Sequence, residues 1–459
     1  MSPIVRSGLG LVLMVACGRE PDLVGPSELV VVIPAETCDA VSCDGETPIC
    51  DEGTCVACTE HDHCDSGVCD RDTRSCIDEA DVVHVVNEGW LGDREPGEDT
   101  SGCGAVDRPC LTLRHGITRL DDASERVWLR LADGPYEAGP HEIEGRLFLI
   151  GGDDVRVEFS LGDTPPMFEV QPGGAIRVDQ VHLRAAQRLV SCEGEDRDPG
   201  RVRIERSLLT DAQSVAVAAR RCEVAIQEST LSGMDDVGLL AESSEVSVLA
   251  STIGPSRGIG VETDRGSLVL ERTLVEGNRE GGVHIDETDF VIRNNFVQDN
   301  GDSGVSGSSV GGILIERDGP EVRVFEFNSI IVNRNGTYSP YAAGVDCFTV
   351  GYIDIRNSVL WHNTRSQEET PRQAGGLCRV AYSAVEFGVT GDDRLEDGPG
   401  NLDLDPRFVD ERRGDYRVSP DSPVIDAADP EANVQVDFDG TPRPAGAGFD
   451  MGAFESPAR

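Results

Sequence analysis

Aromatic, acidic and imidazole side chains gather in one stretch of the sequence, residues 338–362. The residues expected to bind a ligand there are Tyr338, Tyr341, Asp346, Trp361 and His362. Aromatic rings stack on the faces of sugars, and acids beside them bind hydroxyl groups or Ca²⁺. Aromatic residues make up only 5% of the chain, so their concentration here predicts a polysaccharide-binding face. The alternative is that Phe348 and Tyr352 point into the core and the other rings pack the loops.

Cysteines are the second kind of chemically active residue, and the chain has 15 of them. Eight lie close together, namely Cys38, Cys43, Cys50, Cys55, Cys58, Cys64, Cys69 and Cys76. Residues 38–77 contain few large apolar side chains, so we expect a small exported module held by disulfides, whose connectivity the spacing does not fix. The alternative is a zinc site, because Cys55 and Cys58 form C-x-x-C and His61, His63 and Cys64 follow. We favour disulfides and predict no bound metal.

Six further cysteines form three pairs that are close in sequence. These pairs are Cys103 with Cys110, Cys192 with Cys222, and Cys347 with Cys378. The last two gaps are slightly longer than the repeat described below, so these two pairs are each expected to join neighbouring coils.

The first 17 residues are expected to direct export. Arg6 precedes an apolar run at residues 9–15, which is too short to span a bilayer. Small residues up to Ala16 followed by Cys17 resemble the bacterial lipobox, and the resemblance implies that Cys17 carries lipid. Gly18 resembles the residue that follows the lipid-bearing cysteine in outer-membrane lipoproteins. We therefore expect an outer-membrane lipoprotein or another exported cell-surface protein.

A nine-residue pattern of alternating apolar residues recurs along the middle of the chain. Its sixth position is occupied by Val181, Ser207, Thr230, Thr252, Thr273, Asn295, Ser329, Ser358 and Ser383, and Asn294, Asn328 and Asn357 form a column just before it. Alternation predicts short strands with one buried face, and a repeat of roughly 22 residues predicts one solenoid coil per repeat. Nine coils at about 4.8 Å give a rod of roughly 43 Å.

These repeats resemble the right-handed parallel β-helix, or pectate-lyase-like, superfamily over residues 103–395. The segment CGAVDRPCLTLRHGITRL (103–120) looks like the short helix that caps such a helix at its N-terminal end. The resemblance implies an all-β fold, a right-handed parallel β-helix with a small disulfide-rich N-terminal module. It implies little about activity, because this fold carries lyases, hydrolases, esterases and adhesins.

Residues 396–459 contain short Asp- and Arg-rich motifs. Their order, ending in Asp450-Met451-Gly452-Ala453-Phe454-Glu455, is similar to the C-terminal part of choice-of-anchor Q proteins, which are surface proteins held by different anchors. Asp437-x-Asp439-Gly440 begins like a calcium loop, yet the other ligands of such a loop are missing. We therefore expect these residues to tie down turns that cover the open last coil.

No catalytic residues are identifiable in the sequence. A G-H-G motif is absent, as is a G-x-S-x-G nucleophile signature in a strand-turn-helix context, and no lysine exists to act as a base or nucleophile, since all 40 basic residues are arginine. Adjacent acids such as Asp235-Asp236 are expected by chance in a chain with 84 acidic residues. The sequence favours a non-enzymatic protein that contacts polysaccharide or a surface partner. The alternatives are a polysaccharide lyase or glycoside hydrolase and a purely structural envelope protein.

The charge limits the partners further. With 40 Lys+Arg and 84 Asp+Glu, the net charge is −44, which disfavours binding to nucleic acid. The expected organisation is an export segment (1–17), a linker (18–37), the disulfide-rich module (38–77) and a second linker (78–102), before the β-helix and its C-terminal segment. We expect a monomer that needs no cofactor, with Ca²⁺ as the one candidate ion.

Overall fold

The computed structural model describes residues 49–51, 54–88, 97–122, 126–159, 165–301, 310–317, 322–336, 339–365 and 370–457. The expected export segment with Cys17, and Cys38 and Cys43, lie outside these residues. Among the described residues no helix has the length and apolar character needed to cross a bilayer.

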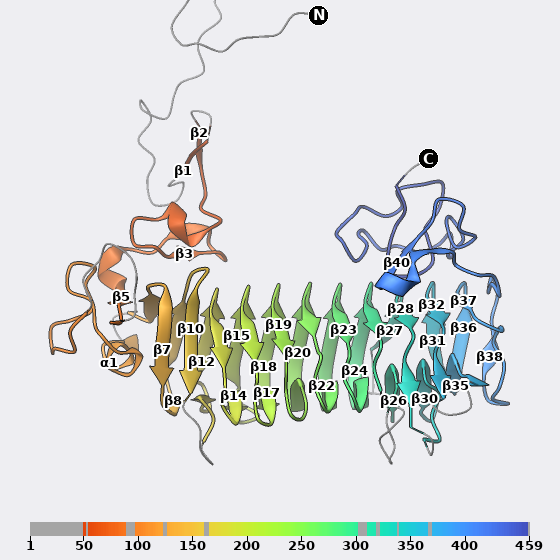
Figure 1. The fold of residues 1–459 in the computed structure, drawn as a ribbon, viewed down its shortest axis with the longest axis horizontal. Coiled ribbons are helices and arrows are strands. Elements are labelled where there is room, and N and C mark those ends of the chain that lie inside the picture. The colour runs from red at the N-terminus through yellow and green to blue at the C-terminus, as the bar shows by residue number, and fades with distance from the viewer. Residues whose placement is uncertain are drawn as a thin grey trace, which may run out of the picture.

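The chain winds into a right-handed parallel β-helix (Figure 1), so the predicted fold class is confirmed. Each coil contributes strands to three parallel ladders. The first is an 11-stranded sheet of β7 (Gly134–Ala138), β10 (Val155–Phe159), β13 (His182–Arg184), β16 (Leu208–Thr210), β19 (Thr230–Ser232), β21 (Thr252–Ile253), β23 (Leu274–Glu276), β25 (Phe296–Gln298), β28 (Ser329–Ile331), β32 (Val359–Trp361) and β37 (Ala384–Val385). Eleven strands at about 4.8 Å span roughly 48 Å, longer than nine coils predict.

The other two ladders merge into one 20-stranded sheet. One ladder holds β8 (His141–Ile143), β11 (Phe168–Val170), β14 (Arg188–Glu193), β17 (Val215–Arg220), β26 (Ile313–Glu316), β30 (Val345–Phe348) and β35 (Ala374–Gly376). The other holds β5 (Val82–Val85), β6 (Trp128–Leu131), β9 (Arg146–Ile150), β12 (Ala175–Asp179), β15 (Gly200–Glu205), β18 (Cys222–Gln227), β27 (Arg323–Glu326), β31 (Ile353–Arg356), β36 (Cys378–Ala381) and β38 (Glu396–Asp397). They join in β20 (Leu239–Leu249), β22 (Ile259–Glu271) and β24 (Gly281–Arg293), which bend at residues with positive φ, Ser243, Arg265 and Glu287.

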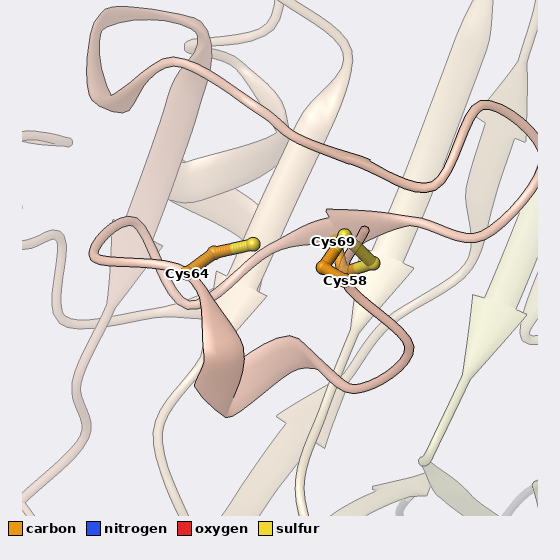
Figure 2. Close-up of side chains that lie close together, drawn as sticks. All are labelled: Cys58, Cys64 and Cys69. Carbon is orange, nitrogen blue, oxygen red and sulfur yellow. A yellow bond between two sulfur atoms is a disulfide. The ribbon is translucent and has the colours of Figure 1, made fainter. Parts of the chain in front are cut away.

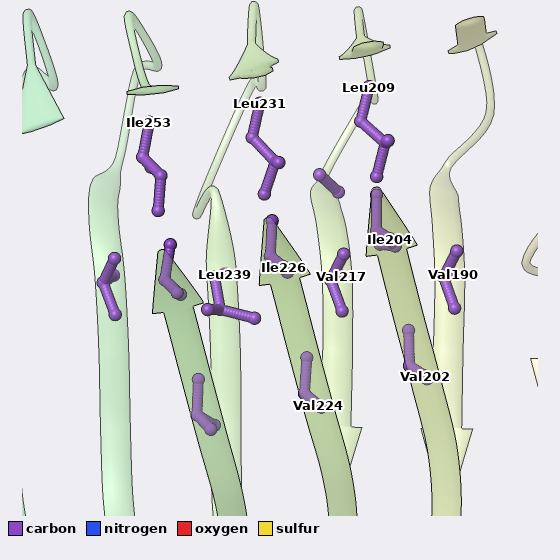
Figure 3. Close-up of a cluster of buried hydrophobic side chains, with 14 of the residues drawn as sticks. Val190, Val202, Ile204, Leu209, Val217, Val224, Ile226, Leu231, Leu239 and Ile253 are labelled. Atoms are coloured by element: carbon purple, nitrogen blue, oxygen red, sulfur yellow. The ribbon is translucent and has the colours of Figure 1, made fainter. Parts of the chain in front are cut away.

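Aliphatic side chains stack inside the coils and form the core. Val202 pairs with Val224 and Ile204 with Ile226 between β15 and β18, and Figure 3 shows these side chains repeating from coil to coil. Each of the four is 3% exposed or less. The alternation read from the sequence therefore identified the buried face, because every second residue of a strand points to the same side.

A buried polar ladder runs along the turn after this core strand, one residue away from some of the expected positions. Ser229 Oγ accepts a hydrogen bond from the Ser207 N–H at 3.1 Å, and Asn328 Oδ1 accepts from the Asn295 N–H at 3.0 Å. Ser251 holds the next equivalent place, accepting from Ser229 N–H.

Three expected ladder positions were therefore wrong. Thr230, Thr252 and Ser329 begin the following strands β19, β21 and β28. The preceding residue with positive φ (Glu228, Ala250 or Phe327) decides which side chain turns inward, and a pattern of residue types does not record that backbone conformation.

A second buried ladder consists of Asn278, Asn300, Asn333 and Asn363. In Asn300, Asn333 and Asn363 the Oδ1 accepts from the backbone N–H of the asparagine one coil earlier, at 3.0–3.1 Å, and Asn278 Oδ1 accepts from the Ser256 hydroxyl at 2.6 Å. Each Nδ2 donates to a carbonyl on the preceding coil, as Asn300 does to Val275 at 2.9 Å. These side chains satisfy backbone groups that the turns would otherwise bury without partners.

The N-terminal end of the rod begins earlier than expected. Strand β5 lies within the expected linker 78–102, after the short η3 turn (Glu79–Asp81), and its four residues are buried against β6. Helix α1 (Leu113–Ile117) falls within the segment expected to cap the helix, and Thr112 caps its N-terminus.

The C-terminal residues divide into two parts. Residues 396–402 continue the last coil through β38, which pairs with β36. Residues 404–457, here called the C-terminal lobe, include β39 (Phe408–Asp410), η5 (Glu411–Arg413) and β40 (Asp415–Val418) and lie on the side of the rod (Figure 1). The lobe receives a 2.8 Å hydrogen bond from Asn294 Nδ2 at Val436 O, and Ala453 N donates to Ser329 Oγ. We expected these residues to cover the open last coil. Residues 404–457 instead form a lobe along the side of the rod.

The cysteine-rich module contains β1 (Ile49–Asp51), β2 (Thr54–Val56), η2 (His61–His63), β3 (Cys69–Asp70) and β4 (Ser75–Cys76). It lies on the same side of the rod as the C-terminal lobe (Figure 1). Small strands β29 (Arg334–Asn335), β33 (Thr364–Arg365) and β34 (Thr370–Pro371) form a separate sheet between the later coils.

Candidate functional site

The structure does not bring the five predicted ligand-binding residues into one site. Tyr338 lies outside the described residues. Tyr341 and Asp346 lie together over strands β26 and β30, whereas Trp361 and His362 lie at the end of β32 in the other sheet. The two sheets form different sides of the rod, so two surfaces must be considered separately.

Trp361 is 7% exposed and belongs to the apolar cluster between the coils and the C-terminal lobe. Its ring is therefore not available to stack on a sugar, which corrects the expectation for this residue. His362 Nδ1 lies 3.0 Å from Glu386 Oε1, and its Nε2 lies 3.5 Å from Glu411 Oε2. The hydrogen bond to Glu386 raises the pKa of His362. Together these contacts hold the lobe, at Glu411, against the last coils.

A charged network lies on the outward face of β22, β24 and β26. Val283 and Ile285 are fully buried, so His284 between them points outward. Its Nδ1 lies 3.4 Å from Glu262 and its Nε2 lies 3.0 Å from Glu316. Burial opposes protonation of His284, but the hydrogen bonds to both carboxylates outweigh it and raise its pKa. The network therefore places the imidazole between two acids, which favour its protonated form.

Tyr341 connects this network to an exposed apolar patch. Its hydroxyl donates to Glu316 Oε1 at 3.3 Å, and its ring contacts Phe348 edge to face with centroids 6.0 Å apart. Phe348 is 49% exposed, and Val350 and Tyr352 in the following turn are 92% and 45% exposed. The alternative expectation that Phe348 and Tyr352 point into the core is wrong. We call Phe348, Val350 and Tyr352 the exposed patch.

Asp346 lies beneath this surface with only 4% exposure. Its Oδ2 accepts a 2.7 Å hydrogen bond from the Ala342 N–H. Burial raises the pKa of Asp346 to about 6, and the nearby Asp392 adds to the effect while the hydrogen bond and two arginines, Arg394 and Arg372, oppose it. A carboxyl group that titrates near pH 6 is able to give and take protons, although this one is largely covered.

Sequence reasoning missed Glu316 and His284. Both residues occupy outward positions of strands whose alternating pattern was recognised. Aligning the strands of neighbouring coils would therefore have placed the two side chains next to each other. The coils around them contain the long insertions after residues 298 and 332, which obscured the alignment of neighbouring strands.

The cysteines form disulfides throughout the part of the chain that the structure describes with side chains. Five bonds join Cys58 to Cys69, Cys64 to Cys76, Cys103 to Cys110, Cys192 to Cys222, and Cys347 to Cys378. The three pairs predicted outside the module are therefore confirmed. Strands β1 and β2 place Cys50 opposite Cys55 in register.

The zinc alternative does not fit the module. Cys58, Cys64 and Cys69 lie close together (Figure 2), yet the first and last are bonded to each other and Cys64 is bonded to Cys76. A zinc site needs free thiolates. His61 is also used, because its Nδ1 accepts from the Cys69 N–H at 3.1 Å and its Nε2 lies 3.2 Å from Asp179 on the rod.

The module is fixed to the first coils by charged groups, several of which are buried. Asp179 is fully buried between His61 and Arg206, and Arg177 joins Asp70 of the module to Glu205 of the rod. Burial alone would raise the pKa of Asp179, but the hydrogen bonds to His61 and Arg206 lower it to about 2. These charged groups therefore form the interface between the module and the rod.

The calcium-like motif of the lobe is largely occupied by its own backbone. Asp437 accepts from the Thr441 N–H at 2.7 Å and from the Glu455 N–H at 2.9 Å, one bond to each oxygen. Glu455 also pairs with Arg443 at 2.9 Å, and both side chains are fully buried. These contacts hold the turns of the lobe together, as expected for the Asp and Arg residues of this segment.

Comparisons with known proteins agree with this architecture. Residues 189–360 match the model of the right handed beta helix region, and residues 24–82 match a family of unknown function, DUF8331. No curated protein matches the chain.

Similar solved structures include pectate lyase Pel9A at 11% identity, covering 83% of this chain and all of that one with a TM-score of 0.44. ORF18 of Geobacillus virus E2 is 12% identical over 61% of this chain and 54% of its own, with a TM-score of 0.33. The Dettilon tailspike protein (gp208) is 11% identical over 60% of each chain, with a TM-score of 0.28. The family match and the stacked ladders together make the central part of this chain a right-handed β-helix.

Proposed function

We propose that this protein is a cell-surface β-helix protein that binds polysaccharide through the exposed patch without converting it. The observation that carries the proposal is the exposure of two aromatic rings, Phe348 and Tyr352, beside the Tyr341–Glu316 pair. Exposed rings next to hydrogen-bonding groups suit a sugar, which offers apolar C–H faces and hydroxyl edges. Strand β30, which leads into the patch, lies at the edge of the rod away from the C-terminal lobe (Figure 1).

Binding is tested with the oxidised protein lacking residues 1–17. Affinity for a panel of neutral and acidic polysaccharides, with and without Ca²⁺, is measured for the parent and for the double variant F348A/Y352A. We expect at least a tenfold loss of affinity for the bound polymer. Phe387→Ala is the matched control, because Phe387 is 60% exposed and lies outside the patch. Equal affinity of parent and double variant would refute the proposed site, and no affinity for any polymer would favour a purely structural envelope role.

A second candidate function is a polysaccharide lyase or hydrolase activity, and the raised pKa of Asp346 favours it. The same panel is incubated with the protein, and polymer length is followed by size-exclusion chromatography. Shortening that Asp346→Asn abolishes would establish the enzyme and overturn the binding role.

Anchoring through lipid on Cys17 is part of the proposal and rests on the lipobox-like sequence. The full chain is expected to enter the detergent phase on Triton X-114 partitioning, and Cys17→Ser is expected to remain in the aqueous phase. Equal partitioning of the two would reject the lipid anchor and leave a secreted protein.

A further inference from the structure

Glu316 is the residue that directly precedes the exposed patch in the register of the coils. It is the Cα partner of Phe348 between β26 and β30, and of Asp286 between β24 and β26. Carboxylates that face each other on neighbouring strands repel. Arg317 pairs with Asp286, so Glu316 depends on a different cation to keep its side chain in one place.

His284 supplies that cation. Its Nε2 lies 3.0 Å from Glu316, and its Nδ1 lies 3.4 Å from Glu262, its Cα partner on β22. A neutral imidazole carries one N–H and donates to only one of the two acids, whereas an imidazolium donates to both. One of the acids therefore loses its hydrogen bond when His284 gives up its proton.

The arginines on the same outward face are already engaged with other acids. The contacts are those of Arg265 with Asp264 and Glu242, and of Arg317 with Asp286 and Glu287. The charge on His284 is thus the one that balances Glu262 and Glu316. Burial lowers the pKa of His284, but the hydrogen bonds to these two acids outweigh burial and raise it above its ordinary value of 6.5.

Glu316 passes this constraint on to the patch. Its Oε2 faces His284, and its Oε1 accepts from the Tyr341 hydroxyl at 3.3 Å. The Tyr341 ring meets Phe348 edge to face with centroids 6.0 Å apart, and Phe348 is 49% exposed. A side chain held in place before binding loses less entropy on contact with a ligand, a gain of about two- to tenfold in affinity.

We propose that His284 is a positioning residue of the exposed patch, whose imidazolium form fixes Glu316 and, through it, Tyr341 and Phe348. The inference rests on the polysaccharide-binding role proposed above. Because folding raises the pKa of His284, its contribution is complete below pH 6.5 and is lost as the pH rises through the higher folded value. The patch is therefore preorganised in acid and loosens in alkali, where it holds a polymer less tightly.

Hydrogen exchange of residues 339–348 tests the positioning without any polymer. It is measured on the oxidised protein lacking residues 1–17 at pH 6.5 and pH 9, with rates corrected for the intrinsic effect of pH. Asp346, whose pKa is about 6, is largely ionised at both values. We expect protection in the parent to fall by about threefold or more at pH 9.

Two variants trace the path of the effect. Tyr341→Phe keeps the ring and removes the hydroxyl, and His284→Gln removes the charge. Both are expected to show at pH 6.5 the low protection that the parent shows at pH 9. His284→Lys keeps a positive charge at pH 9 and should keep the protection high at both values.

His182→Gln is the matched control. His182 lies on β13 in the other sheet and is half-buried, with its Nε2 2.7 Å from Thr210 Oγ1. This variant should show the same pH dependence as the parent. Equal protection of the parent at the two pH values would overturn the proposal. So would unchanged protection in Tyr341→Phe, or an equal loss in His182→Gln.

Binding is measured at the same two pH values with cellohexaose, an uncharged probe, so that the change of pH acts on the protein alone. We expect the parent to bind about threefold or more tightly at pH 6.5, and Tyr341→Phe to bind equally at both values. Binding by the parent that does not change with pH would overturn the role of His284. A parent that binds at neither pH would count against the proposed polysaccharide site, and the exchange result would then decide the role of His284.

Discussion

Asp346 couples the stability of the candidate binding face to pH. Its pKa in the folded protein is about 6, against 3.8 for the free side chain, so folding favours its protonated form. Its stabilising contribution is complete below pH 3.8 and is lost as the pH rises through 6. The shift corresponds to about 3 kcal/mol. We predict that Asp346→Asn is more stable than the parent by up to that amount at pH 7.5 and equal to it near pH 3.5.

Chemical denaturation at several pH values measures this difference. Asp421→Asn is the control, because Asp421 is exposed on the lobe and the pKa of its carboxyl group is lowered by hydrogen bonds to Ser419 and Arg407. A parent-to-variant difference that stays constant from pH 3.5 to 7.5 would contradict the shifted titration of Asp346.

Asn300 illustrates the buried ladders at the same scale. Its Oδ1 accepts from the Asn278 N–H at 3.1 Å and its Nδ2 donates to Val275 O at 2.9 Å. Asn300→Ala leaves both backbone groups without these partners, and we predict a loss of about 2–4 kcal/mol in unfolding free energy. Asn433→Ala, at an exposed position, should cost little. An equally small loss in Asn300→Ala would mean that water replaces the side chain.

Disulfides between coils act at the scale of the element. Cys192 and Cys222 are 30 residues apart and join neighbouring coils, whereas Cys103 and Cys110 are 7 apart. The longer loop restricts the unfolded chain more. Replacing Cys192 and Cys222 by alanine should lower the unfolding free energy by about 3–4 kcal/mol, roughly 1 kcal/mol more than the same change at Cys103 and Cys110. A smaller loss for the longer loop, measured by urea denaturation, would contradict this account.

The elements were largely predictable from the sequence and the sites were not, for a physical reason. Strands such as β15 and β18 repeat a local alternation, and the spacing of Cys192 and Cys222 reflects one coil. Trp361 shows the limit: its burial depends on the lobe, whose contacts join residues far apart in sequence. The contact between the lobe and the coils has the same origin, since Phe296 and Phe438 meet only after the lobe has folded back along the rod.

At the scale of the whole molecule, the module and the lobe both lie along one edge of the rod, and neither lies along the opposite edge (Figure 1). Both dock on the same row of turn residues with positive φ. Arg206 contacts the module, and Asn294 contacts the lobe. Because the module and the lobe both lie on one edge, neither covers the coil face that bears Phe348 and Tyr352. The proposed function uses this arrangement, since the patch proposed to bind polysaccharide lies on a coil face that neither segment covers.

Docking of the module depends on Arg206, which donates to both oxygens of Asp179 at 3.0 Å and to Glu60. Arg206→Ala leaves the fully buried Asp179 with His61 as its remaining side-chain hydrogen-bond partner, and breaking a buried ion pair costs about 3–5 kcal/mol. We predict that the variant loses protection of residues 54–76 in limited proteolysis while the coils remain folded. The parent should lose protease protection of the module only in acid. The contribution of Asp179 to the stability of the docked module is complete above pH 3.8 and is lost as the pH falls toward 2.

Arg257→Ala is the control for this prediction, since Arg257 pairs with Asp235 at 2.9 Å on an exposed part of the rod. Its module should resist protease as the parent's does. If Arg206→Ala were cut no faster than Arg257→Ala, the disulfides and the Arg177 contacts alone would hold the module, and the charged seam at Asp179 would not be what fixes the module to the rod. Faster cutting would show that one buried ion pair holds the module against the rod.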